Sequence, residues 1–96
     1  MIIALLTDFG HRDPYVGMVK VVLYRHGFNG FIVDICHDIV PYSIEHAQFM
    51  LYTTYSFFPA HTIIMSVIDP GVGTQRNILL ATDGIYYFLA PDNGLL

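Results

Sequence analysis

The sequence predicts a three-layer α/β domain with a mostly parallel sheet and a C-terminal hairpin. Short apolar runs typical of buried strands alternate with two longer segments that have helical spacing. This alternation is typical of parallel strands joined by crossover helices. An Asp-Gly pair at residues 83–84 separates two further apolar runs, which is the pattern of an antiparallel hairpin. With 96 residues the chain has room for one domain, so we expect residues 1–96 to form a single Rossmann-like unit.

The first strand and the first helix follow directly from residue patterns. Residues 2–6 form an unbroken apolar run, as expected for a strand that is buried on both faces. Apolar side chains then recur at helical spacing over residues 15–26, with Asp13 as the expected N-cap and Pro14 at the first helical position. Gly27 follows, and glycine is the residue type that most often ends a helix.

The same pattern then repeats. Residues 31–35 predict a second short strand, and residues 36–41 predict a loop. Ser43 has the side-chain chemistry of an N-cap, so we expect a second helix from there to about residue 57. Pro59 then prevents the helix from continuing.

The last part of the chain is expected to be rich in strands. Residues 62–68 predict a third strand, and residues 77–82 and 85–89 predict the hairpin around the Asp-Gly pair. Residues 90–96 have the composition of a tight turn. We expect a structural role there, with contact between Asn93 and a ligand as the lesser alternative.

The composition predicts a large contact surface. Hydrophobic residues make up 54% of the chain and charged residues 12%, about half of the usual charged share of roughly 25%. A domain of this size buries only about 60 to 65% of its unfolded surface. Because that leaves apolar surface exposed, we expect another domain or a symmetric neighbour to cover it. The apolar end at Leu95 and Leu96 adds the expectation of a fragment.

Charge and cysteine content exclude several classes of partner. The net charge is −4, and the four cations are scattered, so no basic stripe is present to bind a nucleic-acid backbone. The single Cys36 excludes an internal disulfide and fits a reducing compartment. No cation precedes the apolar start, and no apolar run approaches the roughly 18 residues that span a bilayer. We therefore expect a cytoplasmic protein with no nucleic-acid and no membrane partner.

Polar side chains follow each of the first three predicted strands. Asp8 follows the first strand, His37 and Asp38 follow the second, and residues 69–76 follow the third. In open α/β sheets the ligand lies beyond the carboxyl ends of the strands. The sequence therefore predicts a ligand site formed by these segments.

Asp8 and its neighbours allow two interpretations. A carboxylate at a strand end can accept two hydrogen bonds from the vicinal hydroxyls of a ribose, and Gly10 allows close backbone approach. Alternatively, Asp8 caps its own turn. Together with His11, Asp13, His37 and Asp38, it also forms an oxygen-rich set that suits a hard divalent cation. Turn structure or packing explains that set better, because adjacent loop residues rarely all point inward.

Residues 69–76 form the most informative loop. Pro70 restricts one backbone angle, and two glycines permit unusual conformations, so the loop can hold Asp69 and Arg76 facing each other over a bound molecule. An arginine within reach keeps the aspartate ionised and oriented, which is useful for positioning a water. The alternative is a structural ion pair that closes the loop. No Gly-Lys-Ser/Thr follows, so the loop is not a P-loop.

Most aromatic residues are expected in the core or at a contact surface, and Tyr42 is the exception. It follows Pro41 at a loop edge, where its ring can stack on a planar or sugar ring.

Six short motifs occur along the chain in an order that resembles one protein family. They are Leu-Thr-Asp-Phe-Gly at residues 6–10, Asp13 with Tyr-Val-Gly at 15–17, Val-Asp-Ile-Cys-His at 33–37, Phe-Pro at 58–59, Asp-Pro-Gly-Val-Gly-Thr at 69–74 with Arg76, and Ala-Pro-Asp-Asn-Gly-Leu at 90–95. Over nearly the whole chain, this order resembles the S-adenosyl-L-methionine (SAM) hydrolases. These enzymes are also called SAM hydroxide adenosyltransferases and are related to fluorinase and chlorinase.

The resemblance implies that water or hydroxide attacks the 5′ carbon of SAM and releases adenosine and L-methionine, with no cofactor and no metal. Asp69 and Arg76 match two of the three family residues that hold this water, and Asp8 matches the carboxylate on the ribose hydroxyls. Tyr42 lies where the halogenases carry an aromatic residue beside the sugar. The halogenases have an uncharged residue in place of Asp69, because a carboxylate repels halide. The resemblance therefore favours hydroxide over halide.

The resemblance also implies a larger assembly. Family members have a C-terminal β-barrel-like domain, and they form each site between two neighbouring subunits of a trimer. The third water-holding residue, a histidine, lies downstream of the position that matches Leu96, and none of the five histidines here matches it. We therefore expect this chain to be the N-terminal domain of a homo-oligomeric SAM hydrolase, without the C-terminal domain.

Two other functions stay open at this point. One is a non-catalytic remnant that binds adenosine or assembles with itself, which the missing histidine and the apolar composition suggest. The other is a metal-dependent phosphohydrolase that uses Asp8, His37, Asp38 and Asp69.

Overall fold

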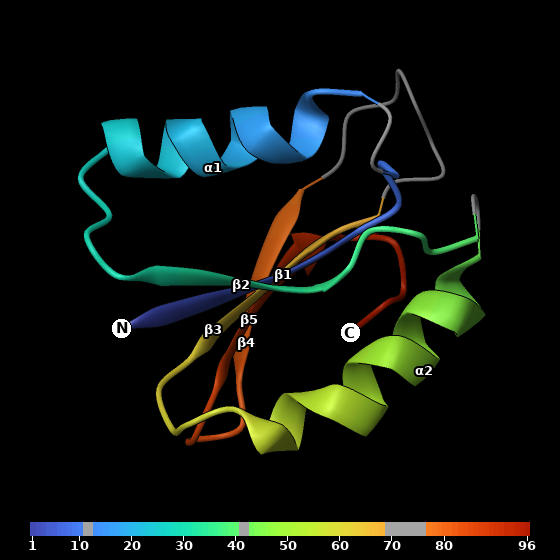
Figure 1. Cartoon of the computed structure of the whole chain (residues 1–96). Coiled ribbons are helices and arrows are strands. Elements are labelled where there is room, and N and C mark those ends of the chain that lie inside the picture. The colour runs from blue at the N-terminus through green and yellow to red at the C-terminus, as the bar shows by residue number, and fades with distance from the viewer. Residues whose placement is uncertain (11–12, 41–42, 69–76) are drawn as a thin grey trace.

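The computed structural model describes residues 1–10, 13–40, 43–68 and 77–96 (Figure 1). Strands and helices alternate through the first two thirds of the chain, and the last two strands follow each other directly. The elements in chain order are β1 (Ile2–Thr7), α1 (Tyr15–Arg25), β2 (Phe31–Cys36), α2 (Ile44–Thr54), a 3₁₀ turn (Tyr55–Phe57), β3 (Ile63–Val67), β4 (Ile78–Thr82) and β5 (Tyr87–Pro91).

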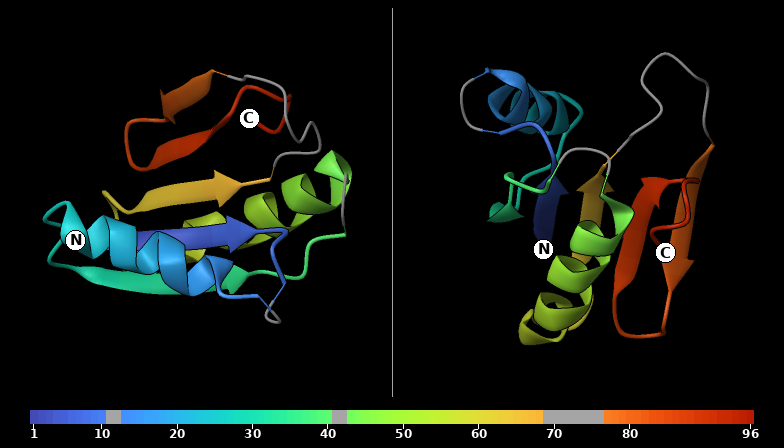
Figure 2. Two further views of the ribbon diagram at one scale, coloured as in Figure 1. Left: turned by 90° about the horizontal axis from the view of Figure 1, so that it is seen from above. Right: turned by 90° about the vertical axis from the view of Figure 1, so that its right-hand side faces the viewer.

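The described strands form one five-stranded sheet in the order β2-β1-β3-β5-β4. β1 pairs in parallel with both β2 and β3, and β3 pairs in parallel with β5. Only β4 runs antiparallel, against β5. Helices α1 and α2 lie on opposite faces of the sheet (Figure 2). The predicted three-layer, Rossmann-like architecture with a C-terminal hairpin is therefore confirmed.

The hydrophobic core lies between the sheet and α2. Alternate residues of β1, Ala4 and Leu6, face this side and pack against Ala47 and Leu51 of α2. The helix α1, by contrast, has no buried residue. It lies over β1 and β2 and leaves β5 and β4 uncovered on its side of the sheet (Figure 2). The main buried cluster therefore lies on the α2 side of the sheet, and α1 leaves large apolar side chains such as Met18 and Val21 exposed.

The start of α1 differs from the prediction. Pro14 occupies the N-cap, and no side chain caps the helix, so the predictions of Asp13 as the N-cap and of Pro14 as the first helical residue are wrong. The physical reason is that the Pro14 carbonyl already accepts the first helical hydrogen bond, from Met18 N at 2.9 Å, which shifts the cap by one position. At the other end, Gly27 adopts a φ of 98° and terminates the helix as predicted.

The second helix begins as predicted and ends earlier. The Ser43 hydroxyl accepts a hydrogen bond from His46 N at 3.1 Å, so Ser43 is the N-cap. The α-helix stops at Thr54 rather than near residue 57, and the last turn tightens to 3₁₀. The Thr54 hydroxyl donates to the Met50 carbonyl at 2.5 Å, and such back-bonding competes with regular helix geometry.

The hairpin has a longer loop than its Asp-Gly signature predicts. Residues 83–86 separate β4 from β5, so the predicted strand start at residue 85 is wrong by two residues. The Asp83 carboxylate accepts hydrogen bonds from Ile85 N at 2.9 Å and Tyr86 N at 2.8 Å, which holds a four-residue loop closed. These backbone hydrogen bonds also lower the pKa of Asp83 below its ordinary value of 3.8.

Membrane crossing by a helix is not supported in the part of the chain described, because neither α1 nor α2 is long and apolar enough to span a bilayer.

Candidate functional site

The carboxyl ends of β1, β2 and β3 lie side by side at one edge of the sheet (Figure 1). Asp8 follows β1, and His37 and Asp38 follow β2, as the order of the elements requires. The Gly10 amide donates to the His37 carbonyl at 2.7 Å, so the segments after β1 and β2 are in direct contact. The structure thus brings together two of the three predicted segments.

Several predicted site residues lie outside the described residues. They are Tyr42, Asp69, Arg76 and the remaining residues of the 69–76 loop, together with His11. Their roles stay predictions. Ile68 is the last described residue before the loop, and it places the start of the loop at the carboxyl end of β3, next to β1.

Two buried side chains meet beneath Asp8. Thr7 is fully buried at the end of β1, and His37 is 1% exposed just after β2. The Thr7 hydroxyl and His37 Nδ1 are 2.7 Å apart. The Phe9 amide donates to the same hydroxyl at 3.2 Å. Buried polar groups of this kind need hydrogen-bond partners, and here they satisfy one another.

The other side of the His37 ring contacts an acid. His37 Nε2 lies 2.8 Å from Asp34 Oδ1, and Lys20 Nζ donates to Asp34 Oδ2 at 2.8 Å. Partial burial raises the pKa of Asp34, but hydrogen bonds from Lys20 and His37 outweigh that effect and lower the pKa below its ordinary value of 3.8. A polar network therefore runs from α1 through β2 to the end of β1.

Asp8 lies in a short segment that this network holds from both sides. The hydroxyl of the preceding residue, Thr7, contacts the His37 ring, and the amide of Gly10 contacts the His37 carbonyl. Gly10 has a φ of 71°, a conformation that favours glycine. Asp8 itself is half-buried, so part of the residue is accessible to solvent.

The turn at residues 90–96 has the structural role that was expected. The Asn93 side-chain amide donates to the Ile68 carbonyl, which joins the end of β5 to the end of β3. The Asn93 side-chain oxygen also accepts a hydrogen bond from Leu95 N at 3.2 Å. Asn93 thereby anchors the backbone from which the 69–76 loop starts.

The geometry around His37 argues against its use as a metal ligand. Both ring nitrogens are within 2.8 Å of protein oxygens, on Thr7 and Asp34. Within the described ranges, no group of three or more His, Cys, Asp or Glu side chains has a metal-binding arrangement.

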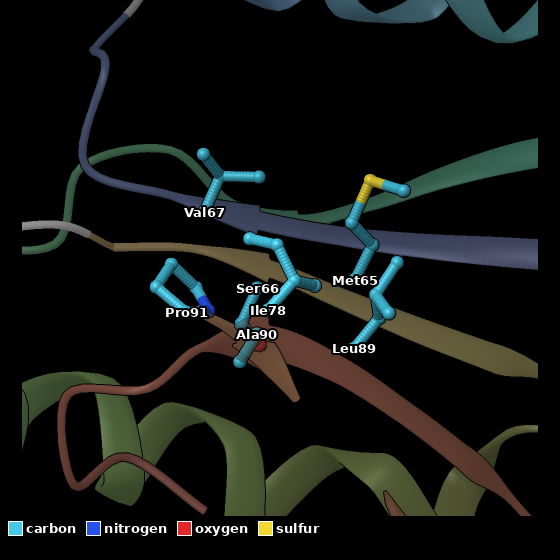
Figure 3. Close-up of a pocket in the computed structure, with 7 residues that line it drawn as sticks. All are labelled: Met65, Ser66, Val67, Ile78, Leu89, Ala90 and Pro91. Carbon is cyan, nitrogen blue, oxygen red and sulfur yellow. The ribbon is translucent and has the colours of Figure 1, made fainter. Parts of the chain in front are cut away.

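An apolar groove lies on the α1 side of the sheet (Figure 3). Met65 and Val67 of β3, Ile78 of β4, and Leu89 of β5 contribute to its lining. The lining contains no charged side chain, and its hydroxyl-bearing residue, Ser66, is buried. A charged nucleoside needs polar partners, so this groove suits an apolar contact better than it suits the predicted ligand.

Sequence reasoning missed the roles of Thr7, Asp34 and Lys20. A threonine at the end of an otherwise apolar strand was one available signal, and an Asp three residues before a His was another. The link to Lys20 had no local signal, because fourteen residues separate it from Asp34.

The family model and the curated relatives that match this chain agree on one family. The family model described as the SAM hydroxide adenosyltransferase N-terminal domain matches residues 3–96. The (R)-S-adenosyl-L-methionine hydrolase of Methanocaldococcus jannaschii is 40% identical over 99 residues, which cover 98% of this chain and 37% of that protein. The hydrolase of the same name from Thermus thermophilus is 38% identical over 90 residues, which cover 94% of this chain and 35% of that protein.

A solved structure from Thermotoga maritima, described as an uncharacterized conserved protein, is similar in fold. Its TM-score is 0.88 at 41% sequence identity, and the match covers 100% of this chain and 37% of that one. The chain therefore spans little more than a third of the length of the relatives that it matches.

Proposed function

The chain belongs to the SAM hydroxide adenosyltransferase family, and from this premise we propose that it is the N-terminal, nucleoside-holding domain of a SAM hydrolase. The reaction is the attack of water or hydroxide on the 5′ carbon of SAM, which breaks the bond from that carbon to sulfur. The products are adenosine and L-methionine. The observation that carries the proposal is the match to this domain over residues 3–96.

Asp8 is the residue that we propose to bind the ribose. A carboxylate accepts hydrogen bonds from both vicinal hydroxyls of the sugar. Its place supports this role, because it follows β1 at the edge of the sheet where α/β proteins bind ligands. Tyr42 would add a stacking surface beside the sugar.

Asp69 and Arg76 are the residues that we propose to hold the attacking water. The sulfonium is already a good leaving group, so departure of methionine needs no general acid. The remaining requirement is a water held in line with the bond that breaks and partly shielded from solvent. A guanidinium beside a carboxylate keeps that carboxylate ionised and oriented toward the water.

The same aspartate bears on the choice of nucleophile. A carboxylate at position 69 would repel a halide ion but accept a hydrogen bond from water or from hydroxide. We therefore favour hydrolysis over halogenation.

The complete site requires more than these 96 residues. We propose that a C-terminal domain of a neighbouring subunit, in a trimer, supplies the remaining water-holding histidine. The match to little more than a third of the relatives' length supports a further domain in the working enzyme. No cofactor or metal takes part in the proposed reaction. The single Cys36 is free, which suits the reducing cytoplasm where we expect the reaction.

The proposal is tested by incubating the chain, joined to the C-terminal domain that completes the site, with SAM and separating the products by chromatography. We expect adenosine above the spontaneous background, and a loss of about a hundredfold or more in Asp69→Asn, because a misplaced nucleophile costs that much. The exposed Asp83 gives a matched control, because Asp83→Asn makes the same chemical change in the loop between β4 and β5, at the opposite end of the sheet from the carboxyl ends of β1, β2 and β3.

Three outcomes are informative. Loss of turnover in Asp69→Asn but not in Asp83→Asn supports the proposed role of Asp69. Equal turnover in both variants contradicts it. Adenosine binding by the chain alone, without turnover, would identify it as a binding domain that needs its partner domain for catalysis.

A further inference from the structure

We propose that Thr7 and His37 act together as positioning residues for Asp8. This inference rests on the proposed function, because the reason to position Asp8 is its contact with the ribose. Neither residue would touch the substrate. Both are buried, Thr7 fully and His37 to 99%, directly beneath the segment that carries the carboxylate.

The first argument is that His37 contacts the Asp8 segment at two points. Its ring lies 2.7 Å from the hydroxyl of Thr7, the residue before Asp8. Its carbonyl accepts a hydrogen bond of 2.7 Å from the amide of Gly10, two residues after Asp8. One residue thus restrains the backbone on both sides of the carboxylate.

The second argument is the direction of the hydrogen bonds. The ionised Asp34 carboxylate can only accept, so His37 Nε2 carries a proton and donates it to Asp34 Oδ1 at 2.8 Å. In the neutral ring Nδ1 then accepts from the Thr7 hydroxyl at 2.7 Å, and the hydroxyl oxygen itself accepts from Phe9 N at 3.2 Å. Contacts at both ring nitrogens fix the orientation of the His37 ring.

The third argument is that the network is anchored at its far end. Lys20 of α1 pairs with Asp34 at 2.8 Å, and Asp34 in turn holds His37. The positioning residues are therefore connected to two elements besides β1, namely α1 and β2. Hydrogen-bonded residues behind a ligand-binding group keep it in the productive geometry.

Thr62 is a second threonine beside the same sheet, and its hydroxyl bonds to a residue that is close in sequence. It is also buried, and its hydroxyl donates to the Pro59 carbonyl at 2.8 Å, only three residues away. It lies before β3, at the end of the sheet opposite to Asp8. Thr7, in contrast, contacts a residue thirty positions away. Thr62 is thus a matched control with the same chemistry and a different position.

The experiment compares the wild-type chain with Thr7→Val, Thr7→Ser and Thr62→Val. Adenosine affinity is measured by isothermal titration calorimetry at a temperature where all four proteins are folded. Hydrogen exchange of the Phe9 and Gly10 amides is measured by NMR in the same samples. We expect Thr7→Val to weaken adenosine binding about tenfold or more, because it removes the buried hydroxyl that His37 Nδ1 contacts.

The expected pattern separates positioning from general stability. Thr7→Val should speed exchange at Phe9 and Gly10 and weaken adenosine binding, and Thr7→Ser should restore both. Thr62→Val should lower the melting temperature and leave both readouts unchanged. Unchanged affinity and exchange in Thr7→Val would overturn the inference alone. No adenosine binding by the wild-type chain would overturn the proposed function, and with it the ribose role of Asp8.

Discussion

Asp34 is the residue at which charge and fold stability are most directly coupled. It contacts Lys20 of α1 and His37 at the end of β2, and their hydrogen bonds lower its pKa below 3.8. A carboxyl group with a lowered pKa adds to the free energy of unfolding above its unfolded pKa, and this contribution is lost as the pH falls through the folded value. The contribution of Asp34 is therefore present at neutral pH and disappears in the acid range below about pH 4.

We expect Asp34→Asn to lower the free energy of unfolding at neutral pH and to have a shrinking effect as the pH falls below 4. Urea unfolding followed by circular dichroism at several pH values measures this difference. The exposed Asp92 provides the control variant Asp92→Asn. A difference between wild type and Asp34→Asn that stays constant from pH 7 to pH 3 would contradict the coupling.

At the scale of elements, the two helices differ in how their N-termini are capped. Ser43 caps α2 through its hydroxyl, whereas α1 begins at a proline with no side-chain cap. The sequence offered a capping residue type near both starts, Asp13 and Ser43. Only the backbone geometry decides which of them accepts a helical amide.

These two residues make a paired prediction. Ser43→Ala should destabilise the domain by about 1 kcal/mol, which is typical for loss of an N-cap. Asp13→Ala should change stability by less than about 0.5 kcal/mol, because the exposed Asp13 does not cap α1. Urea unfolding of both variants checks the pair. A larger loss in Asp13→Ala than in Ser43→Ala would contradict the assigned caps.

Much of the fold could be predicted because local patterns decide it. The alternation of buried strands with helical segments fixed the element types, and the Asp-Gly pair located the hairpin. The loop length could not be predicted, since it depends on the Asp83 side chain bonding two amides at once. The positions of Asp8 and His37 followed from the strand ends, but the contact between Thr7 and His37 depends on the pairing of β1 with β2. Local sequence does not encode the partner of a buried hydroxyl thirty residues away.

At the scale of the whole molecule, the uneven coverage of the sheet is the dominant feature. The main buried cluster lies on the α2 side, while α1 buries none of its residues. All five residues of β4 are exposed, including Ile78 and Leu80. Exposed large apolar side chains on one strand are typical of a contact site. It fits the expectation from composition that the chain carries more apolar surface than it can bury.

We expect the isolated chain to self-associate through this surface at high concentration. Leu80→Glu should reduce that association and leave the melting temperature nearly unchanged, because Leu80 is 70% exposed. Sedimentation velocity at rising concentration measures the effect. Ser56→Glu places the same charge on an exposed residue outside β4, so an equal reduction in both variants would show that only net charge matters.

The central claim is that a nucleoside binds at the carboxyl ends of β1 and β2, beside Asp8. The most direct test is an NMR titration of the ¹⁵N-labelled chain with adenosine, which follows every amide at once. We predict the largest shifts at Asp8, Phe9 and Gly10, with little change at Met65 and Leu89 in the apolar groove. Shifts confined to the groove residues, or no shifts at Asp8 and its neighbours, would contradict the account.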